Sequence, residues 1–259
     1  MTTIAILGLG EAGRRYARGL ARAGATVRGY DPAHELDDPE VTQSSTFAAA
    51  LAGADVALSL VTGQAAESVA REALPHLADG AVYADLNTAA PEVKERIAGL
   101  AADRGLAMAD VAVLAPVVRA GHRTPLLASG PGASAFARRV GPLGVPVEVI
   151  DGAAGEAARL RLLRSVFMKG LAALVLEGLG AAHAVGAEDW LRGQMAQELG
   201  PDGAALIDRL VEGSVRHAAR REHEVRAALA ALDDSGQPAD MTRATLAWFE
   251  RLVAEHDPD

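Results

Sequence analysis

Near its start the chain reads Thr3-Ile4-Ala5-Ile6-Leu7-Gly8-Leu9-Gly10-Glu11-Ala12-Gly13, an apolar run that passes directly into glycines spaced G-x-G-x-x-G. This order predicts a strand, a tight turn and a helix. Gly8 permits the turn, Gly10 lets the backbone approach a pyrophosphate, and Gly13 lets the helix pack tightly on the strand. The free N–H groups at the start of such a helix favour a bound anion. The candidate cofactor contacts in this loop are Gly8, Leu9, Gly10, Glu11, Ala12 and Gly13.

An acidic residue follows the next strand-like run. That run, residues 25–30, ends in Asp31, about 20 residues after the glycines, where a dinucleotide fingerprint places a carboxylate. The carboxylate accepts hydrogen bonds from ribose hydroxyls and repels a 2′-phosphate. We therefore expect NAD as the cofactor, with NADP as the alternative because Arg28 could swing toward a 2′-phosphate. Without Asp31, the glycines alone would also fit a strand–helix turn that binds nothing.

The composition narrows the classes of function. The net charge of −9, the few aromatic residues and the absence of a Lys/Arg-rich block argue against nucleic acid as a partner. The chain has no cysteine, which excludes disulfides and thiolate chemistry, and no H-x-x-x-H or carboxylate cluster indicates a metal site. We see no signal peptide and no apolar run near the ~20 residues that span a bilayer, so we expect a cytoplasmic protein without a membrane partner. The wealth of Ala, Arg and Gly is typical of a bacterial gene of high GC content.

Up to residue 151, strand-like and helical runs alternate. Buried strands are predicted at residues 3–7, 25–30, 55–61, 81–86 and 106–113, with shorter ones at 126–128 and 146–150. Helices are predicted at residues 11–23, 46–51, 65–77 and 91–102, and a polar loop at 31–44. Apolar strands that alternate with helices are typical of a parallel sheet covered on both faces. Residues 1–151 are therefore predicted to form an α/β Rossmann domain with a doubly wound, mainly parallel sheet.

From Gly152 onward the strand-like runs stop and helical periodicity continues almost to the end. Helices are predicted at residues 153–185, 187–198, 202–232 and 238–254. Residues 152–259 are therefore predicted to form an all-α C-terminal domain for substrate binding and dimerisation. The run 153–185 is too apolar for a surface helix. Because it offers more apolar surface than one small domain can cover, we expect a homodimer through the helical domain.

A polar stripe interrupts this apolar run. Arg161, Ser165 and Lys169 recur every four residues and share one helix face, with Arg164 beside them. A buried cation is costly unless it is paired, so the stripe should face a cleft, a carboxylate or a ligand. Reduction of a carbonyl needs a group that protonates the developing alkoxide, and Lys169 is a better acid than any Arg, which stays protonated. In the alternative, Lys169 reaches solvent or pairs with Glu177 or another acid.

A second polar cluster lies at residues 216–224. Its His217, Arg220, Arg221 and Glu224 are spaced to lie on one helical face. Such a face can bind a carboxylate or a phosphate. It can equally be a solvated helix with ion pairs, which the spacing alone favours.

These residues resemble a known family, the β-hydroxyacid dehydrogenases, which include 3-hydroxyisobutyrate and 6-phosphogluconate dehydrogenases. Residues 4–13 are similar to the family's opening fingerprint, and Gly152-Ala153-Ala154-Gly155 before a long helix is similar to its interdomain junction. The C-terminal part is closer to a branch whose second domain is described as an NAD-binding phosphogluconate dehydrogenase domain. The stretches that carry this closer likeness are residues 124–133, 165–170 and 216–221, with Glu224.

The resemblance implies several site residues. The implied cofactor contacts are Gly8, Gly10, Gly13, Asp31, Val61, Thr62, Asn87 and Thr88. The family's junction helix normally carries a Lys and, four residues later, an Asn, where this chain has Arg161 and Ser165. The family's Ser-Gly-Gly substrate loop is replaced by Leu114-Ala115-Pro116. Because Arg161 can clamp a carboxylate but cannot shuttle a proton, the catalytic cation is expected to be Lys169.

The leading hypothesis is an NAD(P)-dependent oxidoreductase that transfers a hydride between nicotinamide and a small, anionic hydroxy or keto acid, or a related C=O or C=N compound. The candidate catalytic residues are Lys169, Arg161 and Ser165, and the candidate substrate-binding residues are Arg164, His217 and Arg220. The alternatives are an imine reductase-like enzyme, which needs no dedicated Lys, and a non-catalytic NAD(P)-binding sensor or scaffold. An enzyme should place Lys169 or Arg161 against the nicotinamide, whereas a sensor leaves both paired with acids.

Overall fold

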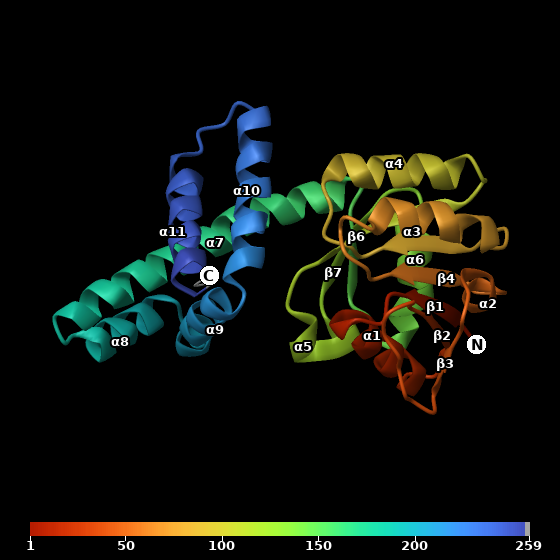
Figure 1. The fold of residues 1–259 in the computed structure, drawn as a ribbon, viewed down its shortest axis with the longest axis horizontal. Helices are drawn as coiled ribbons and strands as arrows, with labels where there is room; N and C mark the ends of the chain where they lie inside the picture. The colour runs from red at the N-terminus through yellow and green to blue at the C-terminus, as the bar shows by residue number, and fades with distance from the viewer. Residues whose placement is uncertain (257–259) are drawn as a thin grey trace. The chain divides into compact units, whose positions relative to one another are not determined.

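The computed structural model describes residues 1–256, and the chain divides into two compact units, Met1–Arg161 and Leu162–Asp259. The first unit is built on one eight-stranded sheet, and the second is built of helices (Figure 1). The predicted fold class, a Rossmann-type α/β region followed by an all-helical region, is confirmed. The domain boundary between residues 151 and 152 stays a prediction.

The sheet has the strand order of a doubly wound dinucleotide-binding fold. Its strands are β1 (Thr3–Leu7), β2 (Thr26–Tyr30), β3 (Val41–Gln43), β4 (Val56–Ser59), β5 (Val82–Asp85), β6 (Ala107–Val113), β7 (Leu126–Ser129) and β8 (Val147–Val149). They follow the order β3-β2-β1-β4-β5-β6-β7-β8, and every neighbouring pair is parallel except β6 and β7. The strand order reverses between β1 and β4, and ligands of such sheets bind outside the carboxyl ends of the strands at that point.

Helices cover both faces of the sheet because each central strand is apolar on both sides. The helices of this unit are α1 (Glu11–Arg22), α2 (Phe47–Leu51), α3 (Ala66–Ala73), α4 (Pro91–Ala102), α5 (Val117–Ala120) and α6 (Ala133–Val140). In β1, Ile4 and Ile6 belong to the core under α1 and α6, whereas Ala5 and Leu7 belong to the core under α2, α3 and α4. This two-sided burial is what a parallel sheet requires.

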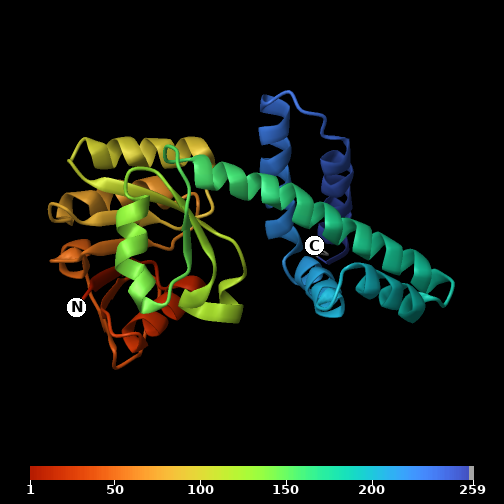
Figure 2. The same ribbon diagram turned by 180° about the vertical axis from the view of Figure 1, so that it is seen from behind.

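The second unit packs its helices around one apolar core. Its helices are α7 (Glu156–Ala184), which starts in the first unit, α8 (Glu188–Glu198), α9 (Gly203–Arg216), α10 (Ala218–Asp234) and α11 (Asp240–His256). Figure 2 shows α7 as one uninterrupted helix. The core joins Val175 of α7 to Ile207, Leu210, Val225 and Phe249 of the later helices.

Two local predictions were wrong. The segment predicted as a polar loop contains β3, a strand too short to show an apolar pattern, which pairs in parallel with β2. The helix predicted over residues 202–232 is broken at His217, which has φ −128° and ψ 34°. Just before the break, the buried Ser214 hydroxyl donates to the Leu210 carbonyl, one turn back (2.5 Å). This type of bond bends helices.

Helix α7 is the one helix, among residues 1–256, that is long and apolar enough to cross a membrane by length and composition. The core helix of a folded domain passes the same test, and Ala172, Val175 and Leu179 of α7 are buried in the helical core. We therefore assign α7 to that core. A cytoplasmic location stays a prediction of the sequence.

Candidate functional site

The glycine turn between β1 and α1 has the geometry of a pyrophosphate loop. Gly8 has φ +95°, and a side chain there would meet the carbonyl of Leu60 at the end of β4. A Cβ on Gly13 would overlap the carbonyl oxygen of Gly8. Gly10, by contrast, is the N-cap of α1 without a side-chain cap, and a Cβ there would meet nothing within 4 Å. Only the Gly10 side of the turn is therefore open to an anion, which fits a pyrophosphate on the N-terminus of α1.

Asp31 lies beside this turn at the end of β2. Its carboxylate accepts hydrogen bonds from the N–H groups of Leu9 (2.7 Å), Ala33 (2.8 Å) and His34 (3.0 Å), and the His34 ring lies 3.1 Å away. Burial alone would raise the pKa of Asp31, but these hydrogen bonds outweigh it and hold the pKa below the usual range. The group therefore stays a carboxylate at neutral pH, as a ribose-binding acid requires.

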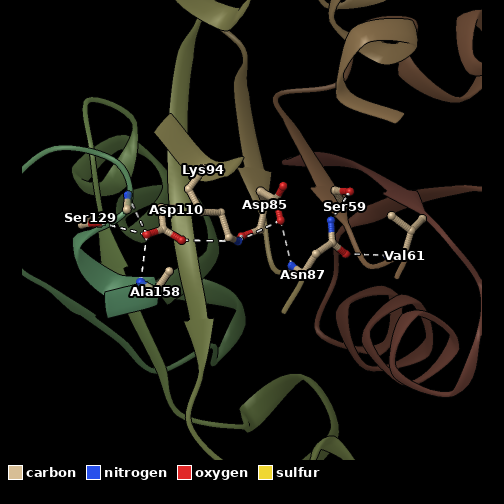
Figure 3. A network of polar contacts seen from close by, with 9 residues as sticks. Ser59, Val61, Asp85, Asn87, Lys94, Asp110, Ser129 and Ala158 are labelled. Atoms are coloured by element: carbon tan, nitrogen blue, oxygen red, sulfur yellow. Dashed lines mark hydrogen bonds and ion pairs between the residues drawn. The ribbon is translucent and has the colours of Figure 1, made fainter. Parts of the chain in front are cut away.

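The ends of β4 and β5 are joined by the side chain of Asn87, which is 5% exposed. Its Oδ1 accepts the N–H of Val61 (2.7 Å), and its Nδ2 donates to Ser59 Oγ (2.9 Å; Figure 3). A Cβ on Gly63 would overlap the carbonyl oxygen of Thr88, so the two loops touch. Of the four residues predicted at these strand ends, Val61, Thr62, Asn87 and Thr88, the two threonines are exposed. The loops that carry them lie together at one edge of the sheet.

A buried ionic network that was not predicted from the sequence lies at the same edge. Lys94 of α4 is 1% exposed, and its Nζ lies 2.9 Å from Asp85 Oδ1 and 3.3 Å from Asp110 Oδ1 (Figure 3). Both carboxylates are fully buried and face each other in the register of β5 and β6. A signal was present, because Lys94 and Lys169 are the only lysines among 25 basic residues. Two apolar strands that end in or contain Asp also indicate a buried cation between them.

The network also reaches the start of α7. Asp110 Oδ2 accepts the N–H groups of Gly155 and Ala158, each at 3.0 Å. Ser129 of β7 lies between the same elements, since its hydroxyl accepts the N–H of Ala157 (3.0 Å) and lies 3.4 Å from Asp110 Oδ2. The first turn of α7 is thus anchored on the sheet through side chains of β6 and β7.

A small pocket is lined both by Arg161, the residue predicted to clamp a substrate anion, and by residues of the sheet edge at which the cofactor is expected to bind (the cofactor edge). The pocket has about 10 Å³, room for about one water molecule. Its lining includes Asn87, Lys94, Asp110 and Arg161. Arg161, predicted from the sequence to bind an anion, therefore lies beside Asn87, which was predicted to contact the cofactor.

Lys169 lies in the second unit, where it pairs with an acid that the sequence did not single out as its partner. Its Nζ is 2.6 Å from Glu224 Oε2, and the two side chains are 17% and 11% exposed. The same carboxylate group accepts a hydrogen bond from Arg220 (3.3 Å). Lys169 is thus paired with an acid, as the alternative interpretation of the sequence had it, and the acid is Glu224 of α10, 55 positions away in sequence, rather than Glu177.

The other predicted residues are exposed or half-buried. Ser165 is half-buried on α7, whereas Arg164, His217 and Arg220 are exposed. Within the residue 216–224 cluster, Arg221 lies close enough to Glu224 and Arg220 to interact with both, and its guanidinium donates to Ser214 Oγ (2.9 Å). Burial lowers the pKa of Arg221 accordingly. Through this bond Arg221 joins the start of α10 to α9, and an anion-binding face in this cluster stays a prediction.

Family models match both parts of the chain. A model described as the NAD binding domain of 6-phosphogluconate dehydrogenase matches residues 3–142, more than half of the chain. A second model, a domain of unknown function (DUF1932), matches residues 182–252. The fold, the glycine turn and this match define a nicotinamide dinucleotide-binding protein. The chain belongs to the β-hydroxyacid dehydrogenase superfamily, as the sequence resemblance implied, and its cofactor is NAD(P).

Individual relatives are consistent with this placement. An uncharacterized 28.5 kDa protein of Methanothermus fervidus is 30% identical over 171 residues, which cover 66% of this chain and 65% of that protein. The crystal structure of a conserved hypothetical protein from Sinorhizobium meliloti 1021 is 34% identical, with a TM-score of 0.76 over 99% of this chain and 89% of that one. 

Two further solved structures share the fold at lower identity. A 3-hydroxyisobutyrate dehydrogenase of Mycobacterium tuberculosis is 20% identical, with a TM-score of 0.80 over 99% of this chain and 95% of that one. An imine reductase of Aspergillus terreus is 21% identical, with a TM-score of 0.67 over 98% of this chain and 94% of that one.

Proposed function

We propose that this protein is an NAD(P)-dependent oxidoreductase that transfers a hydride between the nicotinamide and a small anionic hydroxy or keto acid. The observation that carries the proposal is the position of Arg161 in the same pocket as Asn87. A planar guanidinium there can bind a substrate carboxylate through two parallel hydrogen bonds. A substrate held by this clamp would have its reactive carbon close to the cofactor edge of the sheet.

Each part of the chain has a role in this proposal. The bound dinucleotide supplies or accepts the hydride. The glycine turn holds the pyrophosphate, Asp31 holds a ribose, and the loops that carry Val61 and Asn87 contact the other end of the cofactor. The ammonium of Lys169, held in place by Glu224, delivers the proton that the reduced oxygen needs, and Ser165 lies between the two cations on α7.

One observation favours each alternative. The change of the family's usual lysine to Arg161 removes a dedicated proton donor, as an imine reductase-like enzyme would tolerate. The close pair of Lys169 and Glu224 is what a non-catalytic NAD(P)-binding sensor or scaffold would show. Arg161 favours the enzyme, since its place beside Asn87 has an immediate use in holding an anionic substrate.

A screen by the absorbance of the reduced nicotinamide tests the function. Hydroxy acids are offered with the oxidised cofactor, and keto acids and cyclic imines with the reduced one. We expect turnover of a small acid and competitive inhibition by simple carboxylates. Turnover of neutral imines alone would support the imine reductase, and tight cofactor binding without any turnover would contradict an enzymatic role.

The cofactor preference is a separate prediction. We expect NADH to bind about tenfold or more tightly than NADPH, because a 2′-phosphate beside the Asp31 carboxylate is repelled. The Arg28 guanidinium donates to the Ala52 carbonyl, and it would have to give up this hydrogen bond to offset the repulsion. Calorimetric titration with both nucleotides measures the ratio, and Asp31→Ser should reduce it. Tighter binding of NADPH by the unaltered protein would contradict the assignment.

We also propose a homodimer through the helical domain. On α7, Leu163, Phe167 and Leu174 are 53%, 66% and 56% exposed and lie on one helix face, a surface that a second copy can cover. Light scattering should give twice the 26.6 kDa of the chain, and Phe167→Glu should give a monomer. Met241→Glu, at another exposed apolar residue, is the matched control and should leave the dimer intact. A monomer at micromolar concentration would refute the proposal.

A further inference from the structure

Lys94 is a fully buried cation that the proposed mechanism does not use. Its Nζ contacts the Asp85 carboxylate and backbone carbonyl, each at 2.9 Å, and the Asp110 carboxylate at 3.3 Å. Two carboxyl groups and one amino group are thus buried together in the core. Burying such charge is expensive, and replacing buried ionic groups by apolar ones is often neutral or stabilising. Stability alone therefore does not explain why Lys94 is here.

One side of the network leads to the cofactor edge. Asp85 Oδ1, which binds Lys94, also accepts the N–H of Asn87 (2.8 Å). The Asn87 amide in turn holds the N–H of Val61. Lys94 thus fixes the carboxylate on which the orientation of Asn87 depends. Both Asn87 and Val61 follow strands on the opposite side of β1 from Asp31.

The other side of the network leads to the anion clamp. Asp110 binds Lys94 through one oxygen and the N–H groups of Gly155 and Ala158 through the other. These N–H groups stand at the start of α7, where the helix dipole places a partial positive charge. Arg161 follows Ala158 by three residues on the same helix and lines the same pocket as Asn87. Lys94 therefore links the loop that meets the cofactor with the helical turn that carries the clamp.

The pattern of hydrogen bonds to the buried carboxylate oxygens also indicates that Lys94 has a positioning role. Asp85 Oδ2 is buried without a hydrogen-bond partner among the described residues 1–256, and Asp110 Oδ1 meets the Lys94 ammonium at 3.3 Å without a hydrogen bond of good geometry. A network retained only for stability should satisfy its buried oxygens, since each unmet one carries a desolvation cost. The hydrogen bonds that the two carboxylates do accept instead hold Asn87 and the first turn of α7 in place.

We propose that Lys94 is a positioning residue. It holds Asn87, and with it the nicotinamide end of the cofactor site, at a set position relative to Arg161. The clamp half of this inference rests on the proposed function. The cofactor half does not, because it concerns binding alone. It predicts that loss of the Lys94 charge weakens contacts at the β4 and β5 edge and spares those at the glycine turn and Asp31.

The test compares two ligands that share the adenosine and pyrophosphate but differ in the nicotinamide. NADH and ADP-ribose are titrated by calorimetry into the full chain and into Lys94→Met, which keeps side-chain length without the charge. We expect the Kd of NADH to rise about tenfold, the scale of one lost hydrogen-bonded contact, and the Kd of ADP-ribose to stay within about twofold. Arg96→Met, at an exposed cation on the same helix, is the control and should change neither.

A second variant separates a loss of NADH contacts from a loss of fold. Lys94→Met with Asp85→Asn removes one positive and one negative charge and leaves Asp110 with its N–H donors from α7. It should fold with a Tm near that of the unaltered chain and still show the selective loss of NADH affinity. Equal weakening of both ligands, unchanged NADH binding, or failure of both variants to fold would each make Lys94 a structural residue and overturn the proposal. None of these results depends on finding a substrate, so they are distinguishable from failure of the proposed function.

Discussion

Replacing Lys169 with Met is expected to lower kcat by about 100-fold or more, the scale of a lost general acid, in the reaction that the screen identifies. Met keeps the length and the apolar packing of the lysine stem. The partner Glu224 keeps its bond to Arg220, so Tm should fall by only a few degrees. Steady-state kinetics with the identified substrate, together with thermal unfolding, separates the loss of chemistry from a loss of fold.

Two further variants sharpen this result. Arg161→Lys keeps the charge but loses the fork, so KM should rise more than kcat falls. Arg226→Met removes an exposed cation on α10 and should leave both constants unchanged. Full activity of Lys169→Met would show that the proton comes from elsewhere, and His217 or a bound water would then be the better candidate.

Substitution of Gly10 by Ala is expected to weaken NADH binding by at least about tenfold without loss of stability. Gly10 has φ −62° and ψ −166°, which Ala adopts without strain, and a Cβ there meets no protein atom within 4 Å. The added methyl would instead occupy the side of the turn that the pyrophosphate approaches. Calorimetry and thermal unfolding measure the two effects separately. Binding of NADH with unchanged affinity would place the cofactor elsewhere.

Gly13→Ala is the matched comparison within the same turn. Its Cβ would overlap the carbonyl oxygen of Gly8, and backbone atoms cannot yield as a flexible side chain does. We expect a loss of about 3 kcal/mol or more of unfolding free energy, at the upper end of overpacking effects. Opposite outcomes of these two Gly→Ala changes, three residues apart, would establish that one glycine serves the ligand and the other serves the packing of α1 on β1.

The parts of the fold that sequence analysis predicted are those set by a few consecutive residues. The glycine turn and the starts of the helices predicted at residues 46–51 and 91–102 lie where they were expected: Thr46 Oγ1 accepts the N–H of Ala49, and Pro91 lies in the first turn of α4. Each follows from backbone geometry or from a bond to a residue three positions away. Such features do not depend on the rest of the molecule. The alternation of strands and helices in residues 1–151 and the class of cofactor could therefore be predicted from the sequence.

The same local rules failed where a distant partner decides the outcome. Lys94 lies in an ordinary helical segment, and nothing in its neighbours shows that the register of β5 and β6 places two buried carboxylates around it. The pairing of Lys169 with Glu224 likewise depends on how α7 and α10 pack.

The sequence by itself therefore determined the turn chemistry of the cofactor loop, the strand–helix alternation and the stripe of polar residues on α7. Only the tertiary structure decided which charges meet. Coulomb attraction and desolvation depend on distance and burial in space, and residues 9, 16 or 55 positions apart acquire both only when the strands and helices are packed. For this protein, that packing turns Lys94 from one more basic residue into the link between Asn87 and the turn that carries Arg161.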